Sequence, residues 1–170
     1  RLPDCALTYD PGANEAPTAF VFGPSGVLSR HGGPGARYVW PALQDSVIAT
    51  TDAAGSVVGS VAYDAFGNRA GAMGEPFEYG YTGERHDPVT GLVFLRSRFY
   101  HPATGRFLTP DPADAQKEDP RSIHRYLYAF GDPLTYTDPA GEEGIAGLMA
   151  SMSISNTLSR INNAAQLCAK

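Results

Sequence analysis

Two closely spaced copies of one turn pattern constrain the fold of this chain more than any other feature. Residues 87–91 read DPVTG, residues 101–105 read HPATG, and an aromatic, arginine-bearing segment follows each copy. Proline presets φ and glycine supplies positive φ, so each copy predicts a tight chain reversal. Residues 91–100 are predicted as a long strand with Arg96 and Arg98 on one face, and residues 105–112 as a shorter strand. The repeat predicts consecutive hairpins, each stabilised mainly by its neighbours.

The remaining chain up to Gly141 alternates short apolar segments with turn residues. A hairpin around a Gly-Pro-Ser-Gly turn is predicted, followed by further strands and then by a short aromatic helix or turn. These segments are residues 19–30 for the hairpin, 37–40, 46–51, 57–63 and 77–82 for the strands, and 123–141 for the helix or turn. With 19 Gly, 14 Pro, 9 Tyr and 8 Phe, the composition indicates a mainly β chain of short strands.

Composition excludes several classes of function. The net charge is −5 and the arginines are scattered, which argues against a nucleic-acid surface. The four histidines are far apart, and neither a P-loop nor a Gly-x-Ser-x-Gly elbow occurs, so no metal and no cofactor are predicted. Cys5 and Cys168 lie at opposite ends of the chain and are predicted as unpaired thiols, with a terminal disulfide as the alternative. No apolar run of membrane-spanning length and no signal peptide are visible, and the start at Arg1 favours a piece of something larger.

Several motifs resemble those of Rhs repeat proteins, also called YD-repeat proteins. Residues 63–68, YDAFGN, resemble the tyrosine-aspartate repeat, and residues 44–68 resemble the segment just upstream of the core. Residues 80–112 together with residues 126–141 look like the family's repeat-associated core signature. The resemblance implies upstream shell strands over residues 1–37, a core over residues 38–141, and a C-terminal segment over residues 142–170.

In this family the repeats wind into a β-sheet spiral that closes into a hollow shell. The resemblance implies antiparallel hairpins at the end of such a shell, which encapsulates or presents a C-terminal polymorphic toxin. Tc-toxin C subunits and teneurins use similar shells. The implied partners are the protein's own effector, the remaining shell, and a secretion-system spike or chaperone. The implied location is secreted or delivered at the cell surface of a bacterium, and a cell-surface recognition module stays open as an alternative.

Residues 142–170 carry the only helical pattern of the chain. Ile145, Leu148, Met149 and Met152 follow helical spacing, while Gly147 makes two short helices as plausible as one. Twenty-nine residues cannot build the core of an enzyme. This segment is therefore interpreted as a lead-in to a toxin, or as a plug helix inside the shell.

The resemblance also implies self-cleavage of the aspartyl-protease type, which needs two carboxyl groups in different protonation states. The family has an Asp-Pro-x-Gly, a spacer, and an Asp-Pro-x-Gly-Leu with cleavage after the leucine. Here the first copy reads DPAD from Asp111, the second reads DPAGE from Asp138, and the spacer is longer. Asp111 is the first catalytic candidate, and its possible partners are Asp119, Asp132 and Asp138. The candidate scissile region comprises Gly141, Glu142, Leu148 and Met149.

Both candidate roles have a simpler structural alternative. Asp-Pro commonly opens a turn, so these aspartates need have no catalytic role. Because the motifs also depart from the family pattern, a structural shell segment is favoured over a one-time autoprotease. Arg96, Arg98 and Arg106 could clamp an anion, but they are predicted to pair with nearby acids such as Glu84 or Asp87. Seven aromatic residues are predicted as packing rather than as a glycan platform: Phe94, Phe99, Tyr100, Phe107, Tyr126, Tyr128 and Phe130.

Overall fold

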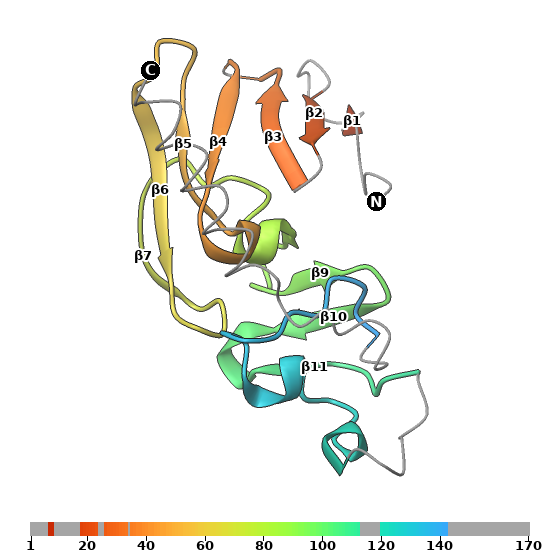
Figure 1. Ribbon diagram of the computed structural model, residues 1–170. Coiled ribbons are helices and arrows are strands. Elements are labelled where there is room, and N and C mark those ends of the chain that lie inside the picture. Colours follow the sequence, from red (N-terminus) through yellow and green to blue (C-terminus); the bar gives the residue numbers. More distant parts are fainter. Residues whose placement is uncertain (1–6, 9–17, 24–25, 34, 113–119, 143–170) are drawn as a thin grey trace, which may run out of the picture.

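The computed structural model describes residues 7–8, 18–23, 26–33, 35–112 and 120–142, which form two antiparallel β-sheets with 3-10 turns within, between and after them (Figure 1). The predicted mainly β class is confirmed. The predicted helical segment over residues 142–170 lies outside the described residues, apart from Glu142.

The first sheet is a meander in which each strand pairs with the next one along the chain. Its strands are β1 (Leu7–Thr8), β2 (Thr18–Gly23), β3 (Gly26–His31), β4 (Arg37–Pro41), β5 (Val47–Thr51), β6 (Val57–Tyr63) and β7 (Arg69–Gly74). The predicted hairpin and the three strands after it are confirmed to within a residue or two. β7 was not predicted; all six of its residues are exposed, and it forms one end of the sheet.

Two aspartates close tight turns in this sheet. Asp52 Oδ1 accepts the backbone N–H groups of Ala54 and Ser56, each at 2.9 Å. Asp64 Oδ1 accepts those of Phe66 and Asn68 at the same distance. These bonds satisfy donors that would otherwise lack partners in a reversal, so each turn fixes the register of the strands beside it.

A strap, residues 75–83, leaves β7 and runs back over one face of the first sheet. Ion pairs Arg30–Glu78 at 3.1 Å and Arg37–Glu75 at 2.7 Å fasten it to β3 and β4. Between the strap and the sheet lies a small core of buried apolar side chains, which comprises Phe20, Val27, Val47 and Tyr79. The strap therefore supplies the second layer that this face of the sheet needs to be shielded from water.

The prediction of a strand over residues 77–82 is wrong. Only Tyr79 forms a bridge, to Arg85, and the 3-10 turn η2 (Tyr81–Gly83) follows. Thr82 has φ 52° and Gly83 has φ 69°, so the backbone turns where the apolar pattern alone would continue a strand. η1 (Leu43–Asp45) lies in contact with η2.

The second sheet contains both copies of the repeated turn. Its strands are β8 (Arg85–His86), β9 (Val93–Leu95), β10 (Arg98–His101) and β11 (Arg106–Phe107), in the spatial order β11-β10-β9-β8. The first copy connects β8 to β9. The second copy forms η3 (Pro102–Thr104) between β10 and β11. Consecutive hairpins were predicted here, and the sheet is built from them.

The prediction of a single strand over residues 91–100 is also wrong. The segment breaks at Arg96 and Ser97, which form a two-residue loop closed by the pair Leu95–Arg98. Arg96 has φ 58°, a left-handed conformation that reverses the chain without glycine. Arg96 and Arg98 consequently do not share a strand face: Arg96 sits in the loop, and Arg98 opens β10 with 3% of its surface exposed.

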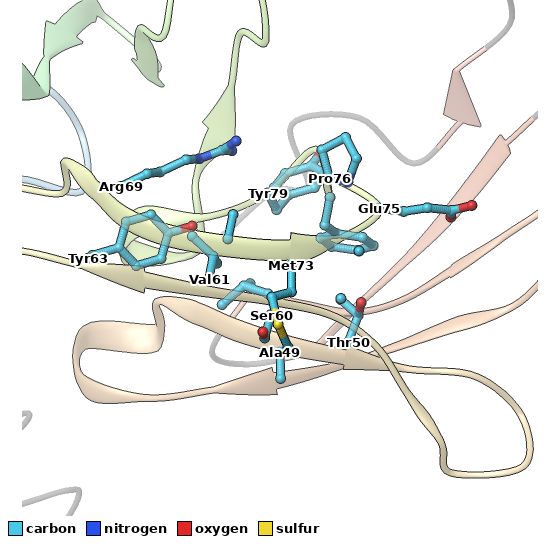
Figure 2. Close-up of a pocket in the computed structure, with 15 residues that line it drawn as sticks. Ala49, Thr50, Ser60, Val61, Tyr63, Arg69, Met73, Glu75, Pro76 and Tyr79 are labelled. Carbon is cyan, nitrogen blue, oxygen red and sulfur yellow. The ribbon is translucent and has the colours of Figure 1, made fainter.

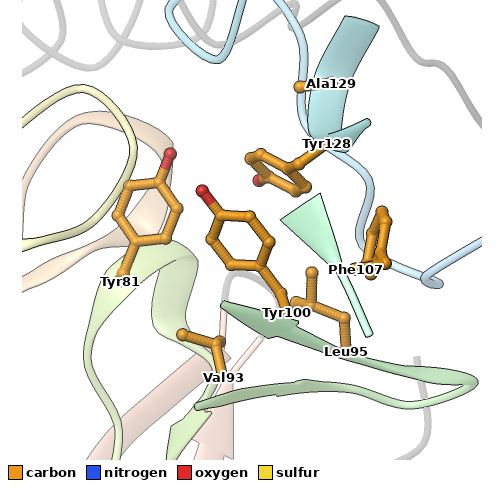
Figure 3. Packing of buried hydrophobic residues seen from close by; sticks show 7 residues of the cluster. All are labelled: Tyr81, Val93, Leu95, Tyr100, Phe107, Tyr128 and Ala129. Atoms are coloured by element: carbon orange, nitrogen blue, oxygen red, sulfur yellow. The ribbon is translucent and has the colours of Figure 1, made fainter. Parts of the chain in front are cut away.

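The core of the second sheet is aromatic and reaches the first sheet through two phenols. Figure 3 shows its members, which are Tyr81, Val93, Leu95, Tyr100, Phe107, Tyr128 and Ala129. The Tyr81 hydroxyl donates to the carbonyl oxygen of Ala65 and the Tyr100 hydroxyl to that of Phe66, both at 2.7 Å. The β6–β7 turn is therefore bonded directly to the second core. Tyr100, Phe107 and Tyr128 are buried as predicted, whereas Phe99 and Tyr126 are exposed.

The last described segment packs against the second sheet. It contains η4 (Pro120–Ile123) and η5 (Tyr128–Gly131), which confirms the predicted short aromatic turn. Leu127 forms a bridge to Arg106, and residues 139–141 end beside the Arg96–Ser97 loop. The point where the chain leaves the described fold is therefore held against the β9–β10 hairpin.

Candidate functional site

A buried arginine lies at the centre of the candidate site. One guanidinium nitrogen of Arg98, Nη2, donates to Asp111 Oδ2 at 2.8 Å and to Asp138 Oδ2 at 3.1 Å. Its Nη1 donates to the carbonyl oxygen of Arg125 at 3.1 Å, and its Cζ lies 3.6 Å from the ring centroid of Phe107. The cation is held by hydrogen bonds and by the aromatic ring at once, which fixes its position.

Two aspartates from distant parts of the chain meet at this guanidinium. Asp111 follows β11 and is 5% exposed, while Asp138 opens the last turn and is 1% exposed. The backbone N–H of Asp111 donates to the carbonyl oxygen of Arg125 at 2.8 Å. In the other direction, the Arg125 guanidinium donates to the carbonyl oxygen of Asp111. These reciprocal bonds keep residues 111 and 125 in register, so Asp111 faces Arg98.

The environment separates Asp138 from an ordinary surface aspartate. Burial raises the pKa of Asp138 above its usual value, and the negative charge of Asp111 raises it further. The backbone N–H of Glu142 and the positive charge of Arg98 act in the opposite direction. Because one cation faces two carboxyl groups in a buried place, a proton on one of them relieves the repulsion between them.

Gly141 brings its own backbone against the hairpin loop. Its φ is +69°, and a Cβ at this position would collide with the carbonyl oxygen of Leu95 and with Ser97 Oγ. Only glycine fits such an approach in this conformation. The carbonyl oxygen of Gly141 accepts bonds from Arg98 Nε and from Ser97 Oγ.

The peptide bond between Gly141 and Glu142 is therefore held at both ends. Its oxygen accepts from Arg98, and its N–H donates to Asp138 Oδ1 at 3.0 Å. A cation at the carbonyl oxygen polarises the carbonyl carbon, and a carboxyl group at the nitrogen can serve the leaving group. Asp111 bonds the same guanidinium, so two carboxyl groups and one cation form a connected cluster that reaches this amide through Arg98 and Asp138.

The structure brings some of the predicted site residues together and leaves one apart. Asp111, Asp138, Gly141 and Glu142 meet at Arg98. Asp132, the other described partner candidate, is exposed, and its Oδ1 accepts the backbone N–H of Thr135 at 3.2 Å within its own turn. Asp119, Leu148 and Met149 lie outside the described residues.

The ion-pair partners of the arginines were predicted from the sequence only in part. The predicted pairing of Arg96 with Glu84 is confirmed, since Nη2 lies 3.1 Å from both carboxylate oxygens. Asp87 instead closes its own turn by accepting the N–H of Val89 at 2.8 Å. Arg98 was not predicted to reach Asp111 and Asp138, because those acids follow it by 13 and 40 residues. Its position next to buried strand residues was the only available signal.

A separate cavity lies between β5, β6, β7 and the strap (Figure 2). It encloses about 90 Å³ and is lined by residues that include Val61, Tyr63, Met73 and Tyr79. Pockets for small molecules are usually several times larger. Within the described ranges, no group of three or more His, Cys, Asp or Glu residues is placed to hold a metal ion. No described helix has the length and apolar character that a membrane crossing requires.

Comparison with known proteins identifies the family to which this chain belongs. Residues 36–134, more than half of the chain, match the model of the Teneurin YD-shell family. The chain therefore belongs to the Teneurin YD-shell family, and the predicted relationship to YD-repeat proteins is confirmed. Its role is that of a structural segment of a YD shell.

The individual relatives are much longer proteins. The chain is 31% identical over 133 residues to the tRNA3(Ser)-specific nuclease WapA of Bacillus spizizenii and to the tRNA nuclease WapA of Bacillus subtilis. Each alignment covers 75% of this chain and 6% of the relative. The crystal structure of TcdB2-TccC3-Cdc42 has a TM-score of 0.65 and 25% identity, and the match covers 80% of this chain and 7% of that one. The crystal structure of TcdB2-TccC3 without its hypervariable C-terminal region has a TM-score of 0.64 and 25% identity. This match covers 79% of this chain and 7% of that one.

Proposed function

We propose that this chain forms the C-terminal end of a YD shell that encloses or presents an effector encoded after Gly141. The observation that carries the proposal is that the last described residues of the chain are anchored to the second sheet. Arg98, Ser97 and Asp138 hold the amide between residues 141 and 142 against the second sheet. A segment that follows such an anchor begins at a defined place relative to the shell.

The size and names of the relatives support the same role. The aligned region is a small share of each relative, and the relatives carry nuclease names. A shell segment that recurs in proteins with such names fits a common container attached to a separate activity. Its partners would be the protein's own effector and the rest of the shell. A secretion-system spike or chaperone would deliver the assembly outside the producing bacterium.

Limited proteolysis of the full-length protein tests enclosure. The region after Glu142 should be cut much more slowly within the intact protein than when it is produced separately. A denaturant concentration that opens the shell should abolish this protection. Equal cutting rates for the enclosed and the separate region would refute enclosure.

We also infer a second function, a single self-cleavage of the bond between Gly141 and Glu142. The observation that favours it is that both ends of this amide contact ionisable groups. Asp111 would take a proton from water while the water oxygen adds to the carbonyl carbon of Gly141. Arg98 Nε would stabilise the negative oxygen that forms.

Asp138 would complete the reaction as the acid. Its Oδ1 already contacts the nitrogen of Glu142, and burial raises its pKa so that it can carry a proton. Transfer of that proton to the nitrogen breaks the C–N bond and leaves a carboxyl group on Gly141 and a free amine on Glu142. Water is the only reactant consumed, and no cofactor enters the step.

Mass spectrometry of the purified chain tests self-cleavage. The wild type should yield a fragment that ends at Gly141, whereas Asp111→Asn and Asp138→Asn should remain intact. Cleavage after Glu142, the position that matches the family leucine, would shift the fragment mass by one glutamate residue and would contradict the assigned bond. An intact wild-type chain would reject self-cleavage altogether.

A further inference from the structure

We propose that the hydroxyl of Ser97 is a catalytic donor that stabilises the carbonyl oxygen of Gly141 during bond cleavage. This inference rests on the proposed self-cleavage between Gly141 and Glu142. Ser97 Oγ lies 2.5 Å from the Gly141 carbonyl oxygen and thus contacts an atom of the reacting amide directly.

The hairpin loop places this hydroxyl beside the chain exit. Ser97 is the second residue of the two-residue loop between β9 and β10, and Arg98 directly follows it. Consecutive residues thus deliver two donors, Oγ and Nε, to one carbonyl oxygen. The absence of a side chain at Gly141 permits this approach, because a Cβ there would lie 2.7 Å from Ser97 Oγ.

The hydroxyl has two acceptors but only one proton. Ser97 Oγ also lies 2.9 Å from the carbonyl oxygen of Ala140. A serine hydroxyl can donate to only one of these oxygens at a time. The Ala140 oxygen already accepts the backbone N–H of Ser97 at 3.3 Å, so it keeps a donor when the hydroxyl turns away.

This choice makes the contribution of Ser97 specific to the transition state. In the intact chain both oxygens are neutral amide acceptors within hydrogen-bond distance of the hydroxyl. When water adds to the carbonyl carbon, negative charge builds on the Gly141 oxygen alone, and the hydroxyl proton is drawn to it. A bond that strengthens only as the reaction proceeds lowers the barrier instead of merely stabilising the starting state.

The expected effect is a large loss of rate with little loss of fold. Removal of one donor from such a site slows comparable reactions about 10²- to 10³-fold. Ser97→Ala should therefore slow self-cleavage about 100-fold, and Ser97→Thr, which keeps a hydroxyl, should recover most of the rate. Because serine does not titrate in this range, Ser97→Ala should lower the rate by the same factor at every pH.

Cell-free synthesis with timed quenching and mass spectrometry measures these rates on the full chain. Ser56→Ala, an exposed serine in the β5–β6 turn, is the matched control and should cleave as the wild type does. Melting temperatures of the uncleaved variants with Asp111→Asn added would reveal any general damage to the fold.

The outcomes distinguish a failure of the Ser97 role from a failure of self-cleavage. If the wild type cleaves and Ser97→Ala cleaves equally fast, the role of Ser97 is refuted while self-cleavage stands. If Ser97→Thr is as slow as Ser97→Ala, the hydroxyl is not the operative group and the proposal is overturned. An intact wild-type chain would remove the proposed self-cleavage and this inference with it.

Discussion

His86 should make the stability of this protein depend on pH between neutrality and mild acid. The ring lies in β8, is 6% exposed, and packs 6.2 Å from the ring of Tyr63. Its Nε2 lies 3.1 Å from the backbone nitrogen of Tyr81 and accepts that N–H. This role requires the neutral tautomer with the proton on Nδ1. Burial lowers the pKa of His86 to about 4, and the charge of Arg69 adds to the effect.

The size and sign of the effect follow from this pKa. Unfolding returns the pKa of His86 from about 4 to its usual 6.5, and each pKa unit corresponds to about 1.4 kcal/mol. The unfolded chain binds the extra proton first as the pH falls. The stabilisation is therefore complete above pH 6.5, is lost progressively towards pH 4, and amounts to about 3 kcal/mol. That is a large share of the about 5–15 kcal/mol that stabilises a typical domain.

Denaturant unfolding at a series of pH values from 7.5 to 4 would measure the loss. His86→Gln offers a non-titrating oxygen to the Tyr81 N–H, and should lose about 3 kcal/mol less than the wild type over this range. Carboxyl groups also titrate there, so the difference between the two proteins is the informative quantity. His124→Gln, at an exposed position, should behave as the wild type does. Parallel pH curves for wild type and His86→Gln would refute the reasoning.

Two further substitutions test the buried polar contacts. Arg98→Met leaves Asp111 and Asp138 without their cation and should lower the free energy of unfolding by about 3–5 kcal/mol; an effect below 1 kcal/mol in denaturant titration would contradict a buried ion triad. Tyr100→Phe removes the hydroxyl bond to the carbonyl oxygen of Phe66 and should cost about 1 kcal/mol, measured as a shift of the unfolding midpoint. No shift would show that this bond contributes nothing to the joint between the sheets.

The first sheet could be predicted because its signals are local. Alternating apolar residues and turn residues mark β2 to β6, and the aspartate turns after β5 and β6 are closed by contacts within five residues. β7 gave no such signal, because RAGAMG contains no β-branched or aromatic residue and buries none of its side chains. Its place in the sheet comes from pairing with β6, which pattern alone does not reveal.

The two wrong strand predictions, over residues 77–82 and 91–100, share one physical cause. Thr82 and Arg96 adopt positive φ without being glycine, so the chain reverses inside runs that read as continuous strands. Tertiary contacts hold these conformations: the N–H of Thr82 donates to Ser46 Oγ at 2.9 Å, and Arg96 bonds Glu84. Sequence periodicity contains no information about such distant partners.

For the candidate site, the sequence marked the acids but not their arrangement. Asp111 and Asp138 stood out through their Asp-Pro motifs, and the resemblance named the chemistry. Ser97 was missed because a small polar residue in a strand-like run ordinarily faces water, and Arg98 was predicted to pair with nearby acids such as Glu84 or Asp87 instead of Asp111 and Asp138. Their importance arises from the loop at residues 96–97, which turns both towards residues 138–142.

The way the β6–β7 turn receives the two tyrosine hydroxyls determines which of its positions can change during evolution. Tyr81 and Tyr100 bond main-chain oxygens, which every amino acid provides, so the joint does not depend on the identity of the side chain at Ala65. Gly67 is different, because a Cβ there would lie 2.5 Å from the Tyr81 ring, and Asp64 supplies the oxygens that close the turn. Sequence drift in this turn should accordingly accumulate at residue 65 and spare residues 64 and 67.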